Sequence, residues 1–193
     1  MTHTADKMQQ SSVDYSIDDQ NRLVYFNSRW NDFAHENESP HLAAENLTGQ
    51  SLFSHISGTE LIQLWQFIID GIRERRTTAE FDYRCDSPQI KRYMKMRVSY
   101  SEGLVHFSSI ILRTAAITGL KIFAANQARS KRLILACSWC KKIKAGETMW
   151  LEPEIAVERL QLLEHNPPPA ISHGVCPACY SNVWDDFERQ LKE

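Results

Sequence analysis

Four of the five cysteines in this chain form two pairs, CSWC at 137–140 and CPAC at 176–179. In each pair two residues separate the cysteines, a spacing that lets both thiolates of one turn reach the same ion. Two such pairs predict a tetrahedral metal site with the ligands Cys137, Cys140, Cys176 and Cys179. We expect zinc there, with rubredoxin-like iron as the alternative. A structural role is expected, because the protein itself fills all four positions.

Other uses of paired cysteines fit the flanking residues less well. A c-type haem needs histidine directly after the second cysteine, whereas Lys141 and Tyr180 stand at those places. A thioredoxin-like dithiol needs one pair on a βαβ frame, and two pairs are present here. The fifth cysteine, Cys85, alternates with the residues of a predicted strand, so a buried thiol is expected.

Three residues near the cysteine pairs are candidate supports for the metal. Lys141 and Lys142 directly follow the first pair. Four thiolates around Zn²⁺ leave a local charge of −2, which these lysines would partly offset, favouring the deprotonated ligands. His173 lies three residues before Cys176 and could pack behind the ligands or replace one thiolate.

The cysteine pairs require elements that bring them together, and the sequence predicts a small module for this at 131–193. The stretch KKIKAGETMWL after the first pair is typical of a hairpin, and a helix is predicted to begin at the second pair. This order indicates a treble-clef-like arrangement. Apolar residues at helical spacing (Ile117, Leu120 and Phe123) predict a connecting helix over 114–130.

The front of the chain shows the pattern of an α+β domain at 13–113, after a lead at 1–12 that is predicted to be disordered. A hairpin comes first, followed by a short helix with Asn27 or Ser28 as its N-cap and by a longer amphipathic helix over 59–72. Period-two alternation then predicts three strands. The order favours a five-stranded antiparallel sheet with helices on one face.

This domain is rich in aromatic residues, which either fill its core or line a pocket for a small ligand. Three arginines, Arg84, Arg92 and Arg97, could meet a ligand carboxylate there. Their positions on the strands instead favour the solvent face. The ligand-pocket candidates are Trp30, Phe33, Phe53, Trp65, Phe81, Tyr83 and Phe107.

Composition excludes several classes of protein. The 193 residues are 42% hydrophobic and 24% charged, with a net charge of −2, as in a soluble globular protein. No apolar run approaches the roughly 18 residues of a membrane span, and the start lacks a signal-peptide pattern. We therefore expect a cytoplasmic protein without membrane contact. No nucleophile elbow, phosphate-binding glycine loop or HExxH pattern is present, so no enzymatic activity is expected.

Taken together, these motifs resemble those of bacterial signalling proteins. YSIDDQNRLVYFNSRWNDFA and LTGQSLFSHISG are similar to the opening and first loop of a PAS domain. The tail, CSWCKKIK…W…SHGVCPAC, resembles a cysteine-rich segment that follows PAS domains in sensor proteins. The resemblance implies a sensor of a small molecule or partner, a metal-bound appendix, and pairing as a homodimer. The cysteine of flavin-binding PAS domains is missing, and the long helix carries no histidine to bind haem.

We therefore expect a non-catalytic regulatory protein that acts through contact with another protein and contains a structural zinc module. One alternative is a transcriptional regulator that binds nucleic acid, favoured by the basic residues at 129–144 and disfavoured by the acidic tail and the balanced charge. Another is a redox sensor that releases its metal when the thiolates are oxidised. The sensed ligand stays open.

Overall fold

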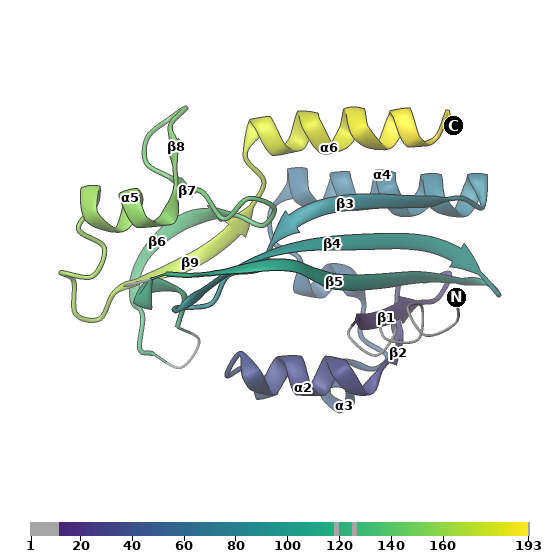
Figure 1. The fold of residues 1–193 in the computed structure, drawn as a ribbon, viewed down its shortest axis with the longest axis horizontal. Coiled ribbons are helices and arrows are strands. Elements are labelled where there is room, and N and C mark those ends of the chain that lie inside the picture. Colours follow the sequence, from purple (N-terminus) through teal and green to yellow (C-terminus); the bar gives the residue numbers. More distant parts are fainter. Residues whose placement is uncertain (1–11, 118–119, 125–126, 193) are drawn as a thin grey trace.

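A computed structural model describes residues 12–117, 120–124 and 127–192 of the chain. The lead predicted to be disordered therefore lies, apart from Ser12, outside the described residues. Within the described part, a large antiparallel sheet is followed along the chain by a smaller mixed sheet (Figure 1).

The larger sheet has five antiparallel strands in the order β2-β1-β5-β4-β3. Its longest strands, β4 and β5, pair from Ile90↔Ala116 to Ser101↔Leu104. The turn between them contains Glu102 and Gly103, both at positive φ, so a glycine suits the second place. The strands are β1 (Val13–Ile17), β2 (Leu23–Phe26), β3 (Thr78–Arg84), β4 (Ile90–Ser101) and β5 (Leu104–Ala116).

Helices cover one face of this sheet, which confirms the predicted fold class. Trp30 of α2 contacts Tyr15, and Trp65 of α4 contacts Phe107. Because Tyr15 and Phe107 stack on each other across β1 and β5, both helices lie on the same face. The helical segments are α2 (Ser28–Glu36), η1 (Pro40–Leu42), α3 (Ala44–Leu47), η2 (Leu52–His55) and α4 (Thr59–Arg75).

The smaller sheet has the order β8-β7-β6-β9, with β6 and β9 parallel and the other pairs antiparallel. The hairpin β7–β8 confirms the predicted hairpin after the first cysteine pair. The elements of the tail are β6 (Ser130–Cys137), β7 (Ile143–Lys144), β8 (Trp150–Leu151), α5 (Pro153–Arg159), β9 (Pro169–Gly174) and α6 (Pro177–Gln190).

The connecting helix predicted over 114–130 is wrong for the described residues of that stretch. Strand β5 continues to Ala116, the 3-10 turn η3 spans Lys121–Phe123, and β6 begins at Ser130. The first part stays extended because it completes the ladder with β4, and Ile117 donates its N–H to the carbonyl of Gln89. The apolar residues then enter a second core, where Ile122 is fully buried, instead of forming a helical stripe.

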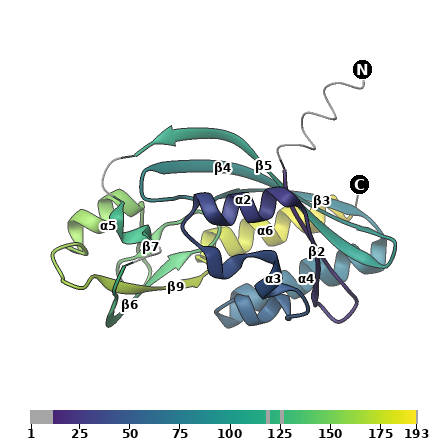
Figure 2. The ribbon, with the colours of Figure 1, turned by 90° about the horizontal axis from the view of Figure 1, so that it is seen from below.

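The tail packs against the first sheet and its helix, so the two predicted modules share one hydrophobic core. Helix α6 lies along α4 (Figures 1 and 2). Phe67 of α4 stacks on Trp184 of α6 with 3.7 Å between ring centroids. Phe187 of α6 is fully buried between Phe67 and Phe81.

Candidate metal centre and adjoining cavity

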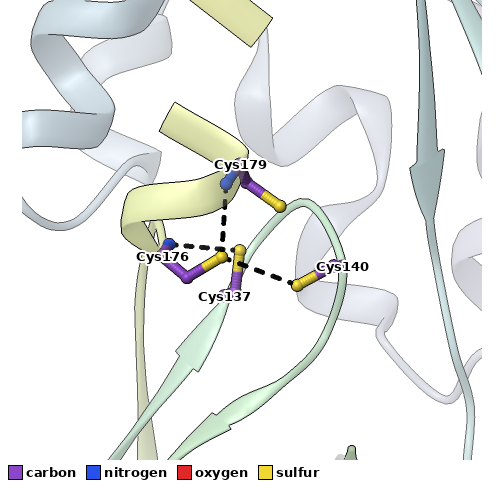
Figure 3. Close-up of side chains that lie close together, drawn as sticks. All are labelled: Cys137, Cys140, Cys176 and Cys179. Atoms are coloured by element: carbon purple, nitrogen blue, oxygen red, sulfur yellow. Dashed lines mark hydrogen bonds between the residues drawn. The ribbon is translucent and has the colours of Figure 1, made fainter. Parts of the chain in front are cut away.

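The four predicted metal ligands lie together, although they come from segments almost forty residues apart (Figure 3). Cys137 ends β6, and Cys140 lies in the turn that follows. Cys176 is the N-cap of α6, and Cys179 lies in the first turn of that helix. The four Sγ atoms lie within 4.8 Å of one another.

This spacing fits one tetrahedral ion. A Zn–S bond of about 2.3 Å places tetrahedral sulfurs about 3.8 Å apart, and the Sγ atoms of Cys140 and Cys176 are 3.9 Å apart. All four thiols are free, so the proximity is not that of disulfides. The cluster could therefore hold a metal ion with four sulfur ligands.

Backbone N–H groups are directed at two of the sulfurs. Cys176 donates its N–H to Cys137 Sγ, and Cys179 donates its N–H to Cys176 Sγ, both at 3.4 Å. These contacts follow from the start of α6, whose first N–H groups have no helical partner. Such donors stabilise a thiolate and orient it toward a metal.

The thiols also influence one another electrostatically. Hydrogen bonds from Cys140 and Cys179 lower the pKa of Cys137, so this sulfur ionises first. Its hydrogen bond in turn raises the pKa of Cys140 to about 12 and also raises the pKa of Cys179. Cys140 and Cys179 can therefore join Cys137 as thiolates only where a cation offsets their charge.

The candidate support residues lie near the cluster but outside it. Lys141 donates from Nζ to the Ser138 carbonyl at 3.0 Å, which ties down the turn that carries Cys140. Lys142 pairs with Glu152 at 3.9 Å. His173 is exposed on β9 and is not a member of the four-sulfur group.

Trp139, between the first two cysteines, joins the metal centre to the larger sheet. Its ring is 5.2 Å from Trp65 and 6.0 Å from Phe81, between centroids. Its Nε1–H donates to the Asp82 carbonyl at 3.1 Å, and its own carbonyl accepts the Arg84 N–H at 2.8 Å. The turn that holds two metal ligands is thus bonded to the outer edge of β3.

Gln190, near the end of α6, is also bonded to the outer edge of β3. Its side-chain oxygen accepts the N–H of Glu80 at 2.8 Å, and its amide nitrogen donates to the Glu80 carbonyl at 3.0 Å. Alternate residues of β3 therefore find their outward hydrogen-bond partners in the tail. An edge strand that would otherwise be open is covered.

A chain of charged residues connects the tail to the loop after β3. Arg84 binds both oxygens of Asp86 and, through Nη1, Glu152 Oε2 at 2.7 Å. The Asp86 side chain is fully buried. A second pair, Lys91–Glu154, joins β4 to α5.

A cavity of about 650 Å³ lies beside this loop, between α2 and the sheet. Three of the seven ligand-pocket candidates line it: Trp30, Phe33 and Tyr83. The N-cap residue Asn27, predicted from the sequence, fixes the start of α2, the helix that carries Trp30 and Phe33. Its Oδ1 accepts the Trp30 N–H at 3.1 Å. The Trp30 indole donates to the Leu42 carbonyl at 2.7 Å.

The other four candidates do not line this cavity. Phe81 and Phe107 are buried in the core, at 4% and 1% exposure. Trp65 and Phe53 pack against that core from the helical side. The alternative interpretation, aromatic residues as core, holds for these four.

Several lining residues were not among the candidates. Met94 and Met96 share a strand face with Arg92, and all three reach the cavity. Tyr15 lines it from β1, and burial raises the pKa of Tyr15 and of Tyr83, which keeps both phenols neutral. For Arg92, Met94 and Met96 the alternation along β4 was the available signal, because it places them on the same face as the buried Val98.

The solvent-face placement expected for the arginines holds only for Arg97. Arg84 is 9% exposed and Arg92 is 8% exposed. Arg84 belongs to the ion-pair chain described above. Arg92 lines the cavity.

The fold and the site together define an α+β protein with a cavity between α2 and the sheet and a four-cysteine cluster suited to a metal ion. No protein-family model matches the sequence, and no curated protein is a significant match to it. Within the part that the structure describes, no helix is long and apolar enough to cross a membrane.

The structural neighbours of this chain are PAS domains of bacterial sensors. Two are structures of the PAS domain of the Cronobacter turicensis RpfR quorum-sensing receptor, in complex with BDSF and with C12:0. Each is 14% identical and covers 53% of this chain and 95% of its own, with TM-scores of 0.42 and 0.41. A sensory box sensor histidine kinase from Vibrio cholerae is 11% identical over 61% of this chain and 90% of its own, with a TM-score of 0.35.

Proposed function

We propose that this chain is a non-catalytic signalling protein in which a PAS-like sheet senses a ligand or partner and a zinc module relays the change. Zinc is the metal we assign to Cys137, Cys140, Cys176 and Cys179, because four thiolates in tetrahedral spacing form a closed structural site. Metal binding would contribute on the order of 10 kcal/mol of apparent folding free energy to the tail.

The relay is the proposed coupling between the cavity and the zinc module. The observation that supports it is that Arg84 forms ion pairs on two sides. On one side it binds Asp86, which lines the cavity. On the other side it binds Glu152, at the N-cap of α5 in the module. A ligand that displaces the loop after β3 would therefore act on the module through the Arg84–Glu152 ion pair.

The distribution of basic residues supports this function over nucleic-acid binding. In the basic stretch at 129–144, Arg129 donates to the carbonyls of Pro169, Ile122 and Ala124. Lys141 and Lys142 also have partners within the protein. These contacts occupy donors of Arg129, Lys141 and Lys142 that phosphate contacts would need, which favours a structural role for the three residues.

The output we propose is a contact with a partner protein in the cytoplasm, made by a homodimer. Four free cysteines in one cluster suit a reducing compartment. Gel filtration with light scattering tests the dimer. A mass equal to that of one chain at all concentrations would refute the proposed homodimer.

Metal content tests the zinc module. Native mass spectrometry of the wild-type chain should show one zinc per chain, and a Cys137→Ser/Cys176→Ser variant should show none together with a lower melting temperature. A Cys85→Ser variant is the matched control, since Cys85 lies outside the cluster. Unchanged metal content and melting temperature in the double variant would refute the module.

The relay has its own test in Glu152→Gln, which keeps the shape of the side chain but removes its charge. Hydrogen exchange in the loop at 85–89 should become faster in this variant. Glu147→Gln removes the same charge from an exposed place in the hairpin and should change nothing there. Equal exchange in the two variants would refute the relay.

A further inference from the structure

Arg92 is a buried cation whose guanidinium forms no ion pair with a carboxylate among the described residues, although its charge adds to the Arg29 hydrogen bond in lowering the pKa of Glu36. Its side chain belongs to a residue only 8% exposed. Within the described part of the chain, the guanidinium donates one hydrogen bond, to the Cys85 carbonyl at 3.3 Å, and it lies 5.5 Å from the centroid of the Phe33 ring. One weak acceptor leaves most of the five N–H donors of the guanidinium available.

The acidic residues of the cavity wall are committed elsewhere or exposed. Both oxygens of Asp86 bind Arg84. Both oxygens of Glu36 bind Arg29, at 2.7 and 2.9 Å. Glu38 lies on the wall but is exposed to solvent. A buried guanidinium in this setting carries a desolvation cost that an anion would offset.

The remaining lining favours a ligand with an apolar body. Trp30 and Phe33 form the α2 wall, and Met94 and Met96 form the sheet wall. Methionine side chains adapt to irregular apolar shapes, and apolar walls with few polar groups are the ordinary composition of a ligand pocket. The volume of about 650 Å³ is within the usual range for such pockets.

We propose that this cavity binds an amphipathic monoanion, with its carboxylate on the Arg92 guanidinium and its apolar part between α2 and the methionines of β4. A single charge is specified because Arg92 is the one cation among the described residues that line the cavity, and a dianion would bury uncompensated charge. This inference rests on the proposed sensing function and names the class of ligand for it.

The proposed headgroup position lies next to the relay. The Arg92 backbone N–H donates to Asp86 Oδ1 at 3.3 Å, and Asp86 is the residue held by Arg84. An anion drawn to Arg92 therefore binds beside the loop that is attached to the module. The geometry gives the ligand a direct mechanical route to Glu152.

Calorimetric titration of the full zinc-loaded chain tests the charge requirement with three probes. Decanoate carries both features, decanol lacks the charge, and acetate lacks the apolar body. We expect decanoate to bind at least about tenfold more tightly than decanol, as charge-assisted hydrogen bonds imply, and acetate not to bind. Equal affinity for decanoate and decanol would overturn the proposal, and this comparison needs no variant.

The variant Arg92→Met locates the charge. It should lose the preference for decanoate while still binding decanol, and Arg97→Met, on the exposed face of the same strand, should keep the preference. Retained preference in Arg92→Met would also overturn the proposal. Absence of binding by all probes would overturn this inference while the zinc module and the relay, tested by metal content and by hydrogen exchange, stand or fall separately.

Discussion

Gly71, in the interior of α4, provides a quantitative test of how the tail is attached. Alanine is preferred to glycine in a helix interior by about 1 kcal/mol, so Gly71→Ala should stabilise an isolated helix. Here a Cβ atom at this position would lie 2.8 Å from Cε1 and 2.9 Å from Cζ of Phe187. Contacts this short force either the Phe187 ring or the whole of α6 to move.

The Phe187 ring has little room to yield. It is fully buried, and the rings of Phe67 and Phe81 lie 5.3 and 6.0 Å from it, between centroids. Overpacking a closed core costs about 1–3 kcal/mol. Against the helix-propensity gain of about 1 kcal/mol, we expect a net loss of about 1 kcal/mol, and at most about 2 kcal/mol, in the free energy of unfolding.

Urea unfolding of the zinc-loaded chain measures this loss, with Gln63→Ala on the exposed face of α4 as a control that should change stability little. A double-mutant cycle with Phe187→Leu isolates the contact. In that background Gly71→Ala should become neutral or stabilising, since the aromatic ring is gone. Stabilisation by Gly71→Ala in the wild-type background would refute the close packing of α4 and α6.

Three further predictions concern the same attachment. Cys176→Ser should lose zinc and lower the melting temperature, whereas Cys85→Ser should keep the metal; metal retained in both would contradict the ligand set. Gln190→Ala should speed hydrogen exchange of the Glu80 N–H and cost about 1 kcal/mol, because two hydrogen bonds are lost; unchanged protection of Glu80 would speak against the sealed edge. Trp139→Ala should cost about 3–5 kcal/mol in thermal or urea unfolding, as for other buried tryptophans, and a cost below about 1 kcal/mol would show that its ring is not held in the core.

Local patterns sufficed for the order of elements in the larger sheet and its helices and for the cysteine cluster. Period-two alternation and the N-cap at Asn27 depend on neighbouring residues only, and both correspond to features of the structure. The cysteine pairs also carry their own information, because each spacing specifies half of a tetrahedral site. In the structure the two halves come together, and the four sulfurs lie within 4.8 Å of one another.

Tertiary contacts explain what local patterns missed. The stretch at 114–116 reads as the start of a helix, but pairing with β4 extends the strand through it. Arg92 has the same parity as Met94, yet a charged residue is expected on the solvent face, and only the cavity explains its inward position. The packing of α6 on α4 depends on the close approach of Phe187 to Gly71, and no spacing in the sequence predicts that contact.

The covered edge of β3 would couple metal binding at the cysteine cluster to the stability of the larger sheet. Trp139 and Gln190 satisfy outward groups of Glu80, Asp82 and Arg84, and both come from the module that holds the cysteines. Any ion that binds only the folded module therefore stabilises the edge of the sheet as well, by an amount set by its concentration relative to its dissociation constant. The reverse holds by the same linkage, because a change in the loop beyond Arg84 that weakens the seal must also weaken metal binding. We therefore propose that ligand binding in the cavity and metal binding at the cysteines are linked through β3.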